Sequence, residues 1–207
     1  MKRGLLITFE GPDGSGKSTQ VEMLKKYLNS RGYEVVFTRE PGGTFIGEKV
    51  RNIILDNKNE NMNPMCEALL YAASRAQLVS EVIKPALKAG KMVICDRFVH
   101  SSIVYQGIAR NLGIDKIKGI NDAALGGLEA DLIFMLNISF EEGLKRKADQ
   151  KEFDRLENSG DEFHRKVFKG YEFISKNYDN ISNIDARKSE NCIHEEIIDI
   201  LEVKLKM

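Results

Sequence analysis

The strongest constraint on the fold of this chain is a glycine-rich segment near its amino terminus. An apolar run, Leu5–Phe9, precedes the segment Gly11-Pro12-Asp13-Gly14-Ser15-Gly16-Lys17-Ser18, which matches the pattern G-x-x-x-x-G-K-[ST]. An apolar run without alternation predicts a strand buried on both faces. A helical pattern follows, with one apolar face formed by Val21, Leu24 and Leu28. A strand, a glycine-rich turn and a helix in this order predict a phosphate-binding loop in an α/β domain.

The loop has the residue types that phosphate binding requires. Its glycines allow the backbone to curl, so that successive N–H groups point at a bound anion. The amino terminus of the following helix adds a partial positive charge. We expect Lys17 to reach the β- and γ-phosphates of ATP, and the Ser18 hydroxyl to ligate Mg²⁺. The residues predicted to bind ATP are Gly11, Pro12, Asp13, Gly14, Ser15, Gly16, Lys17, Ser18 and Thr19.

The rest of the chain alternates between short apolar runs and amphipathic segments. The runs predict strands at 35–37, 92–95, 132–136 and 181–184. The amphipathic segments predict helices at 48–55, 64–88, 102–110, 115–127, 140–147, 162–176 and 189–206, with Pro85 expected to bend the longest one. Alternating strands and helices indicate parallel pairing through crossover helices. We therefore predict a single domain, 1–207, with a five-stranded parallel sheet between helical layers.

Charge and cysteine content limit the classes of protein to which the chain can belong. The 207 residues include 31 Lys and Arg against 31 Asp and Glu, a balance that argues against a broad basic surface for nucleic acid or anionic membranes. No apolar segment is long enough to span a bilayer, and Leu5–Phe9 is too short for a signal peptide. Cys66, Cys95 and Cys192 form no C-x-x-C pair, which predicts reduced, mostly buried thiols in the cytoplasm.

The phosphate-binding loop does not by itself identify a phosphate acceptor. Guanine specificity in GTPases requires N-K-x-D after a late strand, whereas Asn57–Glu60 ends in glutamate and follows no strand, so we expect a surface loop there. A compact chain with this loop indicates a small-molecule kinase. The alternatives are another nucleoside or nucleoside-monophosphate kinase and, from a different class, a nucleotide-dependent switch or binding protein.

A second charged motif follows the strand predicted at 92–95. In open α/β sheets, ligands bind outside the carboxyl ends of the strands, where Asp96 and Arg97 lie. Asp96 is a candidate for Mg²⁺ or its water shell. Arg97 is a candidate for holding phosphate, because guanidinium binds phosphate through two parallel hydrogen bonds. A surface ion pair between the two neighbours is the alternative.

Four stretches together resemble the thymidylate kinase family, in its order and spacing and over nearly the whole chain. They are Phe9–Thr19, Thr38–Thr44, Leu69–Arg75 and Asp96–Gly107. The resemblance implies a three-layer P-loop kinase fold with a small helical lid at about 143–160. It also implies phosphorylation of dTMP to dTDP by MgATP in dTTP biosynthesis, a cytoplasmic location and a homodimer.

The resemblance also assigns the acceptor site. It implies that Tyr71 stacks on thymine, with a core aromatic as the alternative role, and that Arg75 donates to a thymine oxygen. It places Ser102 towards the base, and it places Tyr105 where it crowds the 2′ position and so favours deoxyribose. The phosphate and sugar of the acceptor are assigned to Asp13, Arg51 and Arg97, and the remaining acceptor residues are Arg39 and Gln106. For Arg51 and Arg39, an exposed helix or surface charge is the alternative.

Residues 141–171 form a run of mixed charge that composition alone assigns to a solvated helical face. The resemblance implies a lid that closes over ATP. Because Gly14-Ser15 supplies no basic side chain, the lid must supply the cation that stabilises the transition state, and Arg146, Lys151 and Arg155 remain open candidates. The predicted catalytic residues are Lys17, Arg97, Arg155, Lys151 and Asp13. Residues 184–187 resemble the segment that passes the adenine.

Overall fold

The computed structural model describes residues 3–147 and 153–206 and confirms the predicted parallel sheet. Its strands are ordered β2-β3-β1-β4-β5, and every neighbouring pair is parallel. The strands are β1 (Leu6–Glu10), β2 (Val35–Arg39), β3 (Met92–Asp96), β4 (Leu132–Asn137) and β5 (Ser182–Asp185). With β1 in the centre, the loop that follows it opens at the middle of the carboxyl edge of the sheet.

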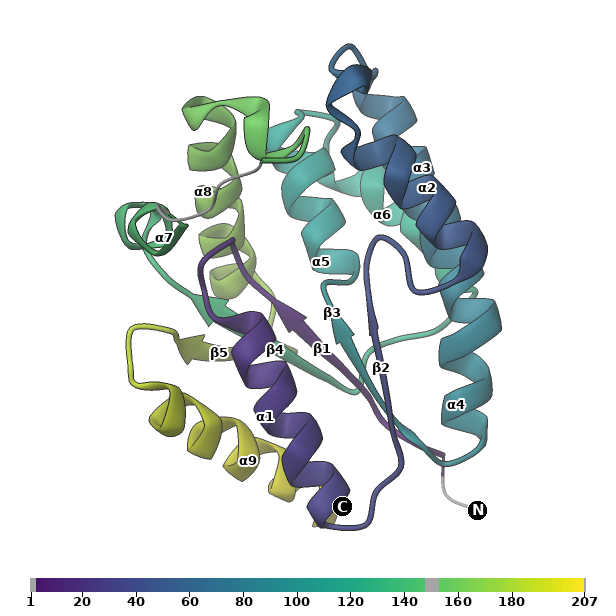
Figure 1. Cartoon of the computed structure of the whole chain (residues 1–207), viewed down its shortest axis with the longest axis vertical. Helices are drawn as coiled ribbons and strands as arrows, with labels where there is room; N and C mark the ends of the chain where they lie inside the picture. Colours follow the sequence, from purple (N-terminus) through teal and green to yellow (C-terminus); the bar gives the residue numbers. More distant parts are fainter. Residues whose placement is uncertain (1–2, 148–152, 207) are drawn as a thin grey trace.

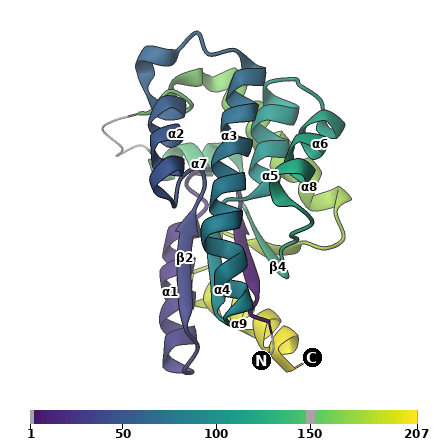
Figure 2. The same cartoon turned by 90° about the vertical axis from the view of Figure 1, so that its right-hand side faces the viewer.

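Helices cover both faces of the sheet (Figures 1 and 2). Ile7 and Phe9 belong to one apolar cluster with the buried faces of α1 (Lys17–Ser30) and α9 (Glu190–Lys206). Leu6 belongs to another cluster, with the end of α3 (Pro64–Leu78) and with α4 (Lys84–Lys88). Side chains alternate between the two faces of a strand. Because a helical layer covers each face of the sheet, β1 carries apolar side chains on both of its faces.

A third apolar cluster lies beyond the carboxyl ends of the strands. It brings together side chains of α2, α3, α6, α8 and the helical segment that follows α5. Figure 1 shows these helices rising above the tips of β1 and β3. The bounds are α2 (Phe45–Leu55), α5 (Val99–Ser102), α6 (Ile114–Leu125) and α8 (Asp161–Asn177). These helices therefore form a wall beside the space at the carboxyl edge of the sheet.

Strand register brings the two predicted phosphate motifs together. Phe9 of β1 pairs with Asp96 of β3, and Arg97 N donates to Phe9 O at 2.9 Å. The loop that starts after Glu10 therefore lies beside Arg97, although the two segments are far apart in the sequence.

Two predicted helices differ from the regular α-form. The helix predicted at 64–88 consists of α3, a π-helical turn (Val79–Ile83) and α4, with Pro85 in the first turn of α4. A proline has no N–H to donate to the preceding turn, so the hydrogen bonding changes at the place where a bend was expected. The helix predicted at 102–110 is mostly a π-helical segment, Ile103–Ala109, which continues α5.

The region predicted to form a lid, at about 143–160, includes the end of α7 (Phe140–Lys147) and a 3₁₀ turn (Glu157–Ser159). Residues 148–152, and with them the candidate cation Lys151, lie outside the described residues. Gly14 has a φ of 78°, and a Cβ there would come within 2.8 Å of Gly143 O. A glycine at this position lets the phosphate-binding loop touch α7.

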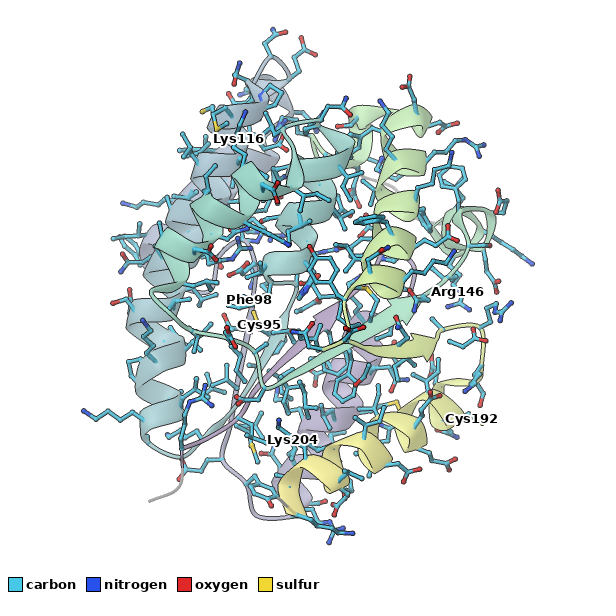
Figure 3. All side chains as sticks on the ribbon, turned by 180° about the vertical axis from the view of Figure 1, so that it is seen from behind. Cys95, Phe98, Lys116, Arg146, Cys192 and Lys204 are labelled. Carbon is cyan, nitrogen blue, oxygen red and sulfur yellow. The ribbon has the colours of Figure 1, made fainter. Side chains whose placement is uncertain are left out.

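The cysteines are only partly as predicted. All three are free, but Cys95 alone is buried, whereas Cys66 and Cys192 are exposed on α3 and α9. Figure 3 shows Cys95 inside the molecule and Cys192 at its outer side. The mostly buried set expected from composition is therefore wrong, because both exposed cysteines lie on the outward sides of amphipathic helices. Within the described part of the chain, no helix combines the length and apolarity that crossing a bilayer needs.

Candidate active site

The phosphate-binding loop encloses the ammonium group of Lys17. This group donates to Gly11 O at 3.0 Å and Pro12 O at 2.9 Å, and only 7% of the residue is exposed. Burial lowers the pKa of Lys17 to about 8, and the nearby positive charge of Arg97 acts in the same direction. Asp13, Asp96 and Glu10 oppose the shift. The ammonium is thus a charge held with little solvent, which strengthens its attraction to a phosphate.

Arg97 joins the phosphate-binding loop to the acceptor side. Its guanidinium donates to Asp13 Oδ1 at 2.5 Å and to Gly11 O at 3.0 Å. It also donates to Tyr171 Oη at 2.8 Å and lies over the ring of Tyr105, 5.4 Å from the centroid. The side chain is therefore held from several directions, and its position is fixed relative to the loop.

A chain of hydroxyl groups continues from Arg97 into the core. Ser101 Oγ donates to Glu10 Oε2 at 2.5 Å, and Tyr171 Oη lies 2.8 Å from Ser101 Oγ. Because the Ser101 proton is on the bond to Glu10, the Tyr171 hydroxyl donates to Ser101 and accepts from Arg97. Glu10 is fully buried and also accepts from Phe98 N at 2.9 Å. Tyr171 Oη thus accepts from Arg97 and helps to fix the position of its guanidinium.

Beside Arg97 lies a cavity of about 230 Å³ on the acceptor side. Its lining includes most of the predicted acceptor residues, namely Asp13, Arg51, Tyr71, Arg75, Arg97, Ser102, Tyr105 and Gln106. A neighbouring hollow of about 390 Å³ is lined by Lys17, Ser18, Thr19 and Arg39, among others. The two share Asp13, Glu40, Arg51, Arg97 and Glu157. A group bound in one hollow and a group bound in the other would meet between Asp13 and Arg97.

Arg75, which is expected to donate to a thymine oxygen, directs its donors to protein acceptors in the structure. It is 1% exposed, and its guanidinium donates to both carboxylate oxygens of Glu40. The other donors go to Ser102 Oγ at 3.0 Å, Asn121 Oδ1 at 2.5 Å and Phe98 O at 3.1 Å. Guanidinium has five N–H groups, and five acceptors surround this one. Arg75 lines the cavity, but here its donors hold the cavity wall together.

Glu40 is the buried partner of this arginine. Burial raises the pKa of the Glu40 carboxyl to about 7, although the Arg75 guanidinium opposes the shift. The pair links the segment that follows β2 to α3 within the wall of the cavity. Glu40 lies in Thr38–Thr44, one of the stretches that carry the family resemblance, but nothing in its local sequence indicates that it is buried.

Gln106 has one free polar atom in the interior. Its Nε2 donates to Glu67 Oε1 at 2.9 Å, whereas its Oε1 is buried and accepts no hydrogen bond from the described residues. The residue is 1% exposed and lines the acceptor cavity. An unpaired buried oxygen is costly unless a partner arrives, so Gln106 is suited to accept a hydrogen bond from a ligand.

The two remaining predicted arginines lie at the mouth of the site. Arg51 is half-buried and donates to Pro41 O at 2.9 Å, and burial lowers its pKa. Arg39 is 45% exposed and pairs with Glu48 at 3.1 Å. Arg51 lines both hollows, whereas Arg39 lines only the hollow beside the phosphate-binding loop. The structure therefore places Arg51 where the two hollows adjoin and Arg39 at the rim of one of them.

The residues predicted to hold a metal lie on the phosphate side. Ser18 and Asp96 line the same hollow as Lys17. Asp96 Oδ1 is buried and has no hydrogen-bond partner among the described residues. A carboxylate oxygen without a partner and a hydroxyl that line one hollow are ligands suited to a hard cation such as Mg²⁺, which keeps several water and phosphate ligands besides. These residues fit the predicted metal.

Two lid cations have different surroundings. Arg146, on α7, donates to Gly14 O at 3.3 Å and to Ala186 O at 3.0 Å, so it bridges the phosphate-binding loop and the segment after β5 (Figure 3). Arg155 is 6% exposed and donates to Ile54 O at 2.6 Å and to Glu67 Oε2 at 2.7 Å. The contacts of Arg155 thus go to α2 and α3 rather than to the phosphate-binding loop.

Several residues of the site carried no assignment in the sequence. Tyr171 and Asn121 reach it from distant helices, and no local pattern signals such contacts. Glu67 is different, because it lies four positions before Tyr71 on the same helix. Residues at i and i+4 share a helix face, so that spacing could have placed Glu67 near the cavity.

The asparagine-lysine segment behaves as predicted. Residues Asn57–Asn59 form a short 3₁₀ turn after α2, and Lys58 is exposed. The segment is not at the end of a strand, so the structure gives no guanine-binding element there.

A parallel sheet of this order, with a phosphate-binding loop after its central strand and a second cavity beside it, defines a P-loop kinase. The family model described as thymidylate kinase matches residues 9–197. The thymidylate kinase of Thermoanaerobacter sp. (strain X514) is 48% identical over 200 residues, which cover 96% of this chain and 98% of the relative. The chain belongs to the thymidylate kinase family.

Further relatives agree with this assignment. The thymidylate kinase of Finegoldia magna is 47% identical over 197 residues, covering 95% of this chain and 97% of the relative. That of Exiguobacterium sp. is 44% identical over 197 residues, covering 95% and 93%. The similarity therefore extends over the phosphate-binding loop, the acceptor cavity and the lid.

Proposed function

We propose that the cleft transfers the terminal phosphoryl group of ATP to dTMP, the activity of the thymidylate kinase family to which the chain belongs. The observation that carries the proposal is the pair of hollows that meet between Asp13 and Arg97. One has the phosphate-binding loop, and the other has an aromatic side chain and hydrogen-bonding groups suited to a base. Transfer between two bound nucleotides requires such a meeting point.

We assign the base of dTMP to the deep end of the acceptor cavity. Tyr71 lines it and offers a ring for stacking. Gln106 Oε1 would accept from N3–H of thymine, which satisfies the buried oxygen. Ser102 accepts from Arg75 at 3.0 Å, so its own hydroxyl proton is available to an oxygen of the base. Tyr105, 8% exposed, would leave little room for a 2′-hydroxyl.

The charged residues at the mouth would hold the acceptor phosphate. Arg97 and Arg51 both line the two hollows, and their guanidinium groups can bind phosphate oxygens in a bidentate manner. Asp13 pairs with Arg97 and orients it. The acceptor oxygen of a monophosphate is already anionic, so the transfer needs positioning and charge neutralisation rather than a strong base.

Lys17 and one lid cation would neutralise charge on the phosphoryl group during transfer. Mg²⁺, held by Ser18 with help from Asp96, would supply further positive charge at the phosphates of ATP. Among the lid cations we favour Arg146, because its guanidinium already reaches Gly14 O. Arg155 then anchors the lid to α2 and α3, and Lys151 remains a candidate outside the described residues.

We further propose that residues 1–207 act as one domain, with residues 143–160 as its lid, and that two copies form a dimer. One face of α2 exposes Phe45, Ile46 and Ile53, which are 76%, 50% and 48% exposed. Leu69 on the neighbouring α3 is 52% exposed. An apolar surface over two packed helices is typical of an interface. Three free cysteines suit a reducing cytoplasm.

The substitution Arg97→Ala tests the acceptor assignment. We expect kcat/KM for dTMP to fall about a thousandfold, since an arginine that binds the transferred or accepting phosphate is worth this much. Affinity for MgADP should change little, because Lys17 and the loop remain. Steady-state kinetics with dTMP and calorimetric titration with MgADP give both values.

The exposed Arg39→Ala is the matched control, with a far smaller loss. An unchanged kcat/KM for dTMP in Arg97→Ala would remove Arg97 from the site. Loss of MgADP binding instead would show that Arg97 maintains the loop rather than the acceptor.

A further inference from the structure

Glu67 is a buried carboxylate that accepts hydrogen bonds from several side chains beside the acceptor cavity. It lies on α3, is fully buried, and does not line the cavity itself. Four N–H groups donate to its carboxylate: Gln106 Nε2 at 2.9 Å, Arg110 Nε at 3.3 Å, Arg110 Nη2 at 3.2 Å and Arg155 Nη2 at 2.7 Å. With donors on both oxygens, the group acts only as an acceptor.

This constraint fixes the orientation of the Gln106 amide. A side-chain amide has one end that donates and one that accepts. A carboxylate can only accept, so Gln106 must turn its Nε2 to Glu67. The other end, Oε1, is left without a partner among the described residues. Because Glu67 holds Nε2 of Gln106, the atom that Gln106 presents to a base is its acceptor, Oε1.

An acceptor at this place discriminates between pyrimidines. Thymine carries a proton on N3 and an oxygen at position 4, whereas cytosine has an unprotonated N3 and an amino group at position 4. N3 of thymine can donate to Gln106 Oε1, but N3 of cytosine would face that oxygen with a second lone pair. A mismatch of this kind leaves buried polar groups unpaired, which strongly disfavours the wrong ligand.

We infer that Glu67 is a specificity-determining positioning residue, which selects thymine over cytosine by holding the amide of Gln106 in one orientation. The inference rests on the proposed placement of the base beside Gln106. Glu67 touches neither nucleotide, so its effect passes through Gln106. The two arginines keep the carboxylate in place, and one of them, Arg155, belongs to the lid region.

The decisive variant is Glu67→Gln. Its amide has a donor end, which allows Gln106 to turn round and to present Nε2 to the base. We expect the ratio of kcat/KM for dTMP to kcat/KM for dCMP to fall about tenfold or more. In the double variant with Glu67→Gln and Gln106→Glu, the new carboxylate again offers only acceptors, and the preference for dTMP should return. A simple packing defect would not be repaired by adding a buried charge.

Two controls separate the possible outcomes. Arg110→Lys disturbs the same cluster but leaves Glu67 an acceptor, so it should keep the ratio. Gln106→Met removes the amide at similar size and should lower kcat/KM for dTMP. If Gln106→Met leaves that value unchanged, the placement of the base fails and the inference with it. If Gln106→Met is impaired but Glu67→Gln lowers both substrates in proportion, the inference alone is overturned.

A crystal structure of the unsubstituted protein with dTMP tests the inference even if Glu67→Gln does not fold. We expect the Gln106 amide within hydrogen-bond distance of both the Glu67 carboxylate and N3 of thymine. An amide that has left Glu67, or that lies away from N3, would overturn it.

Discussion

Arg97 has a φ of 65°, a left-handed backbone conformation that side chains other than glycine rarely adopt. Such a conformation costs about 1 kcal/mol or more, and the contacts of its guanidinium with Asp13, Gly11 and Tyr171 offset it. The sequence predicted Arg97 from its place after a strand. It could not predict Tyr171, because 74 positions separate the two partners and only the packed fold joins them.

Lys17 provides a prediction of pH dependence. Burial lowers its pKa to about 8, so the ammonium of the free protein loses its proton as the pH rises through 8. A bound phosphate favours the charged form, and binding above this pH must therefore take up a proton. We expect the affinity for MgADP to fall about tenfold between pH 7 and pH 9.

Calorimetric titration at several pH values measures this change. In Lys17→Met the affinity should be lower throughout and nearly independent of pH over the same range. A wild-type affinity that stays flat up to pH 9 would contradict the lowered pKa.

At the scale of elements, the sheet and most helices follow from local pattern, whereas the π-helical segments do not. Residues 64–88 and 102–110 were predicted as helices, and they are helical. The shift from α- to π-hydrogen bonding depends on neighbouring elements, for which the sequence gives no signal. Tyr105 and Gln106, which line one cavity, both lie in the π-helical segment Ile103–Ala109.

The region proposed as a lid shows the same limit, and it yields a prediction. From the sequence, Arg146, Lys151 and Arg155 are equally good candidates for the cation that stabilises the transition state. The structure buries Arg155 against Glu67 and places Arg146 at the phosphate-binding loop. Removing one partner of a buried ion pair costs about 3 kcal/mol or more. Arg155→Ala should therefore lower the melting temperature by about 10 °C. Arg146→Ala should leave it nearly unchanged while kcat falls about a hundredfold or more.

Thermal unfolding and steady-state kinetics on both variants give these values. Arg165→Ala, on α8, removes another cation nearby and serves as the control. Its melting temperature and its kcat should both change little. A large loss of kcat in Arg155→Ala at unchanged stability would reverse the two roles.

At the scale of the whole molecule, the exposed apolar face of α2 predicts self-association. Ile53→Asp places a charge on that face, and burying an unpaired charge in an interface is strongly unfavourable. We expect dimers for the wild type and monomers for Ile53→Asp in sedimentation equilibrium at micromolar concentration. Val203, on α9, is 60% exposed against 48% for Ile53, and the control variant Val203→Asp should remain dimeric. A monomeric wild type would contradict the interface.

The distribution of charge is also a property of the whole molecule. With 31 cationic and 31 acidic residues, the molecule as a whole is neutral, yet Lys17, Arg51 and Arg97 converge on adjoining hollows. The acids Glu40 and Glu67 are buried partners of arginines, and of the two only Glu40 lines the hollows. Composition could exclude a broad basic surface, but only the fold shows where positive charge is concentrated.

The most direct test is the initial rate of ADP release with MgATP and a panel of acceptors: dTMP, dCMP and AMP. If the base stacks on Tyr71, donates to Gln106 and has its 2′ position crowded by Tyr105, as we propose, kcat/KM is highest for dTMP, by a factor of about a hundred or more over the others. A higher kcat/KM for dCMP or AMP, or ADP release that no acceptor increases, would contradict the account.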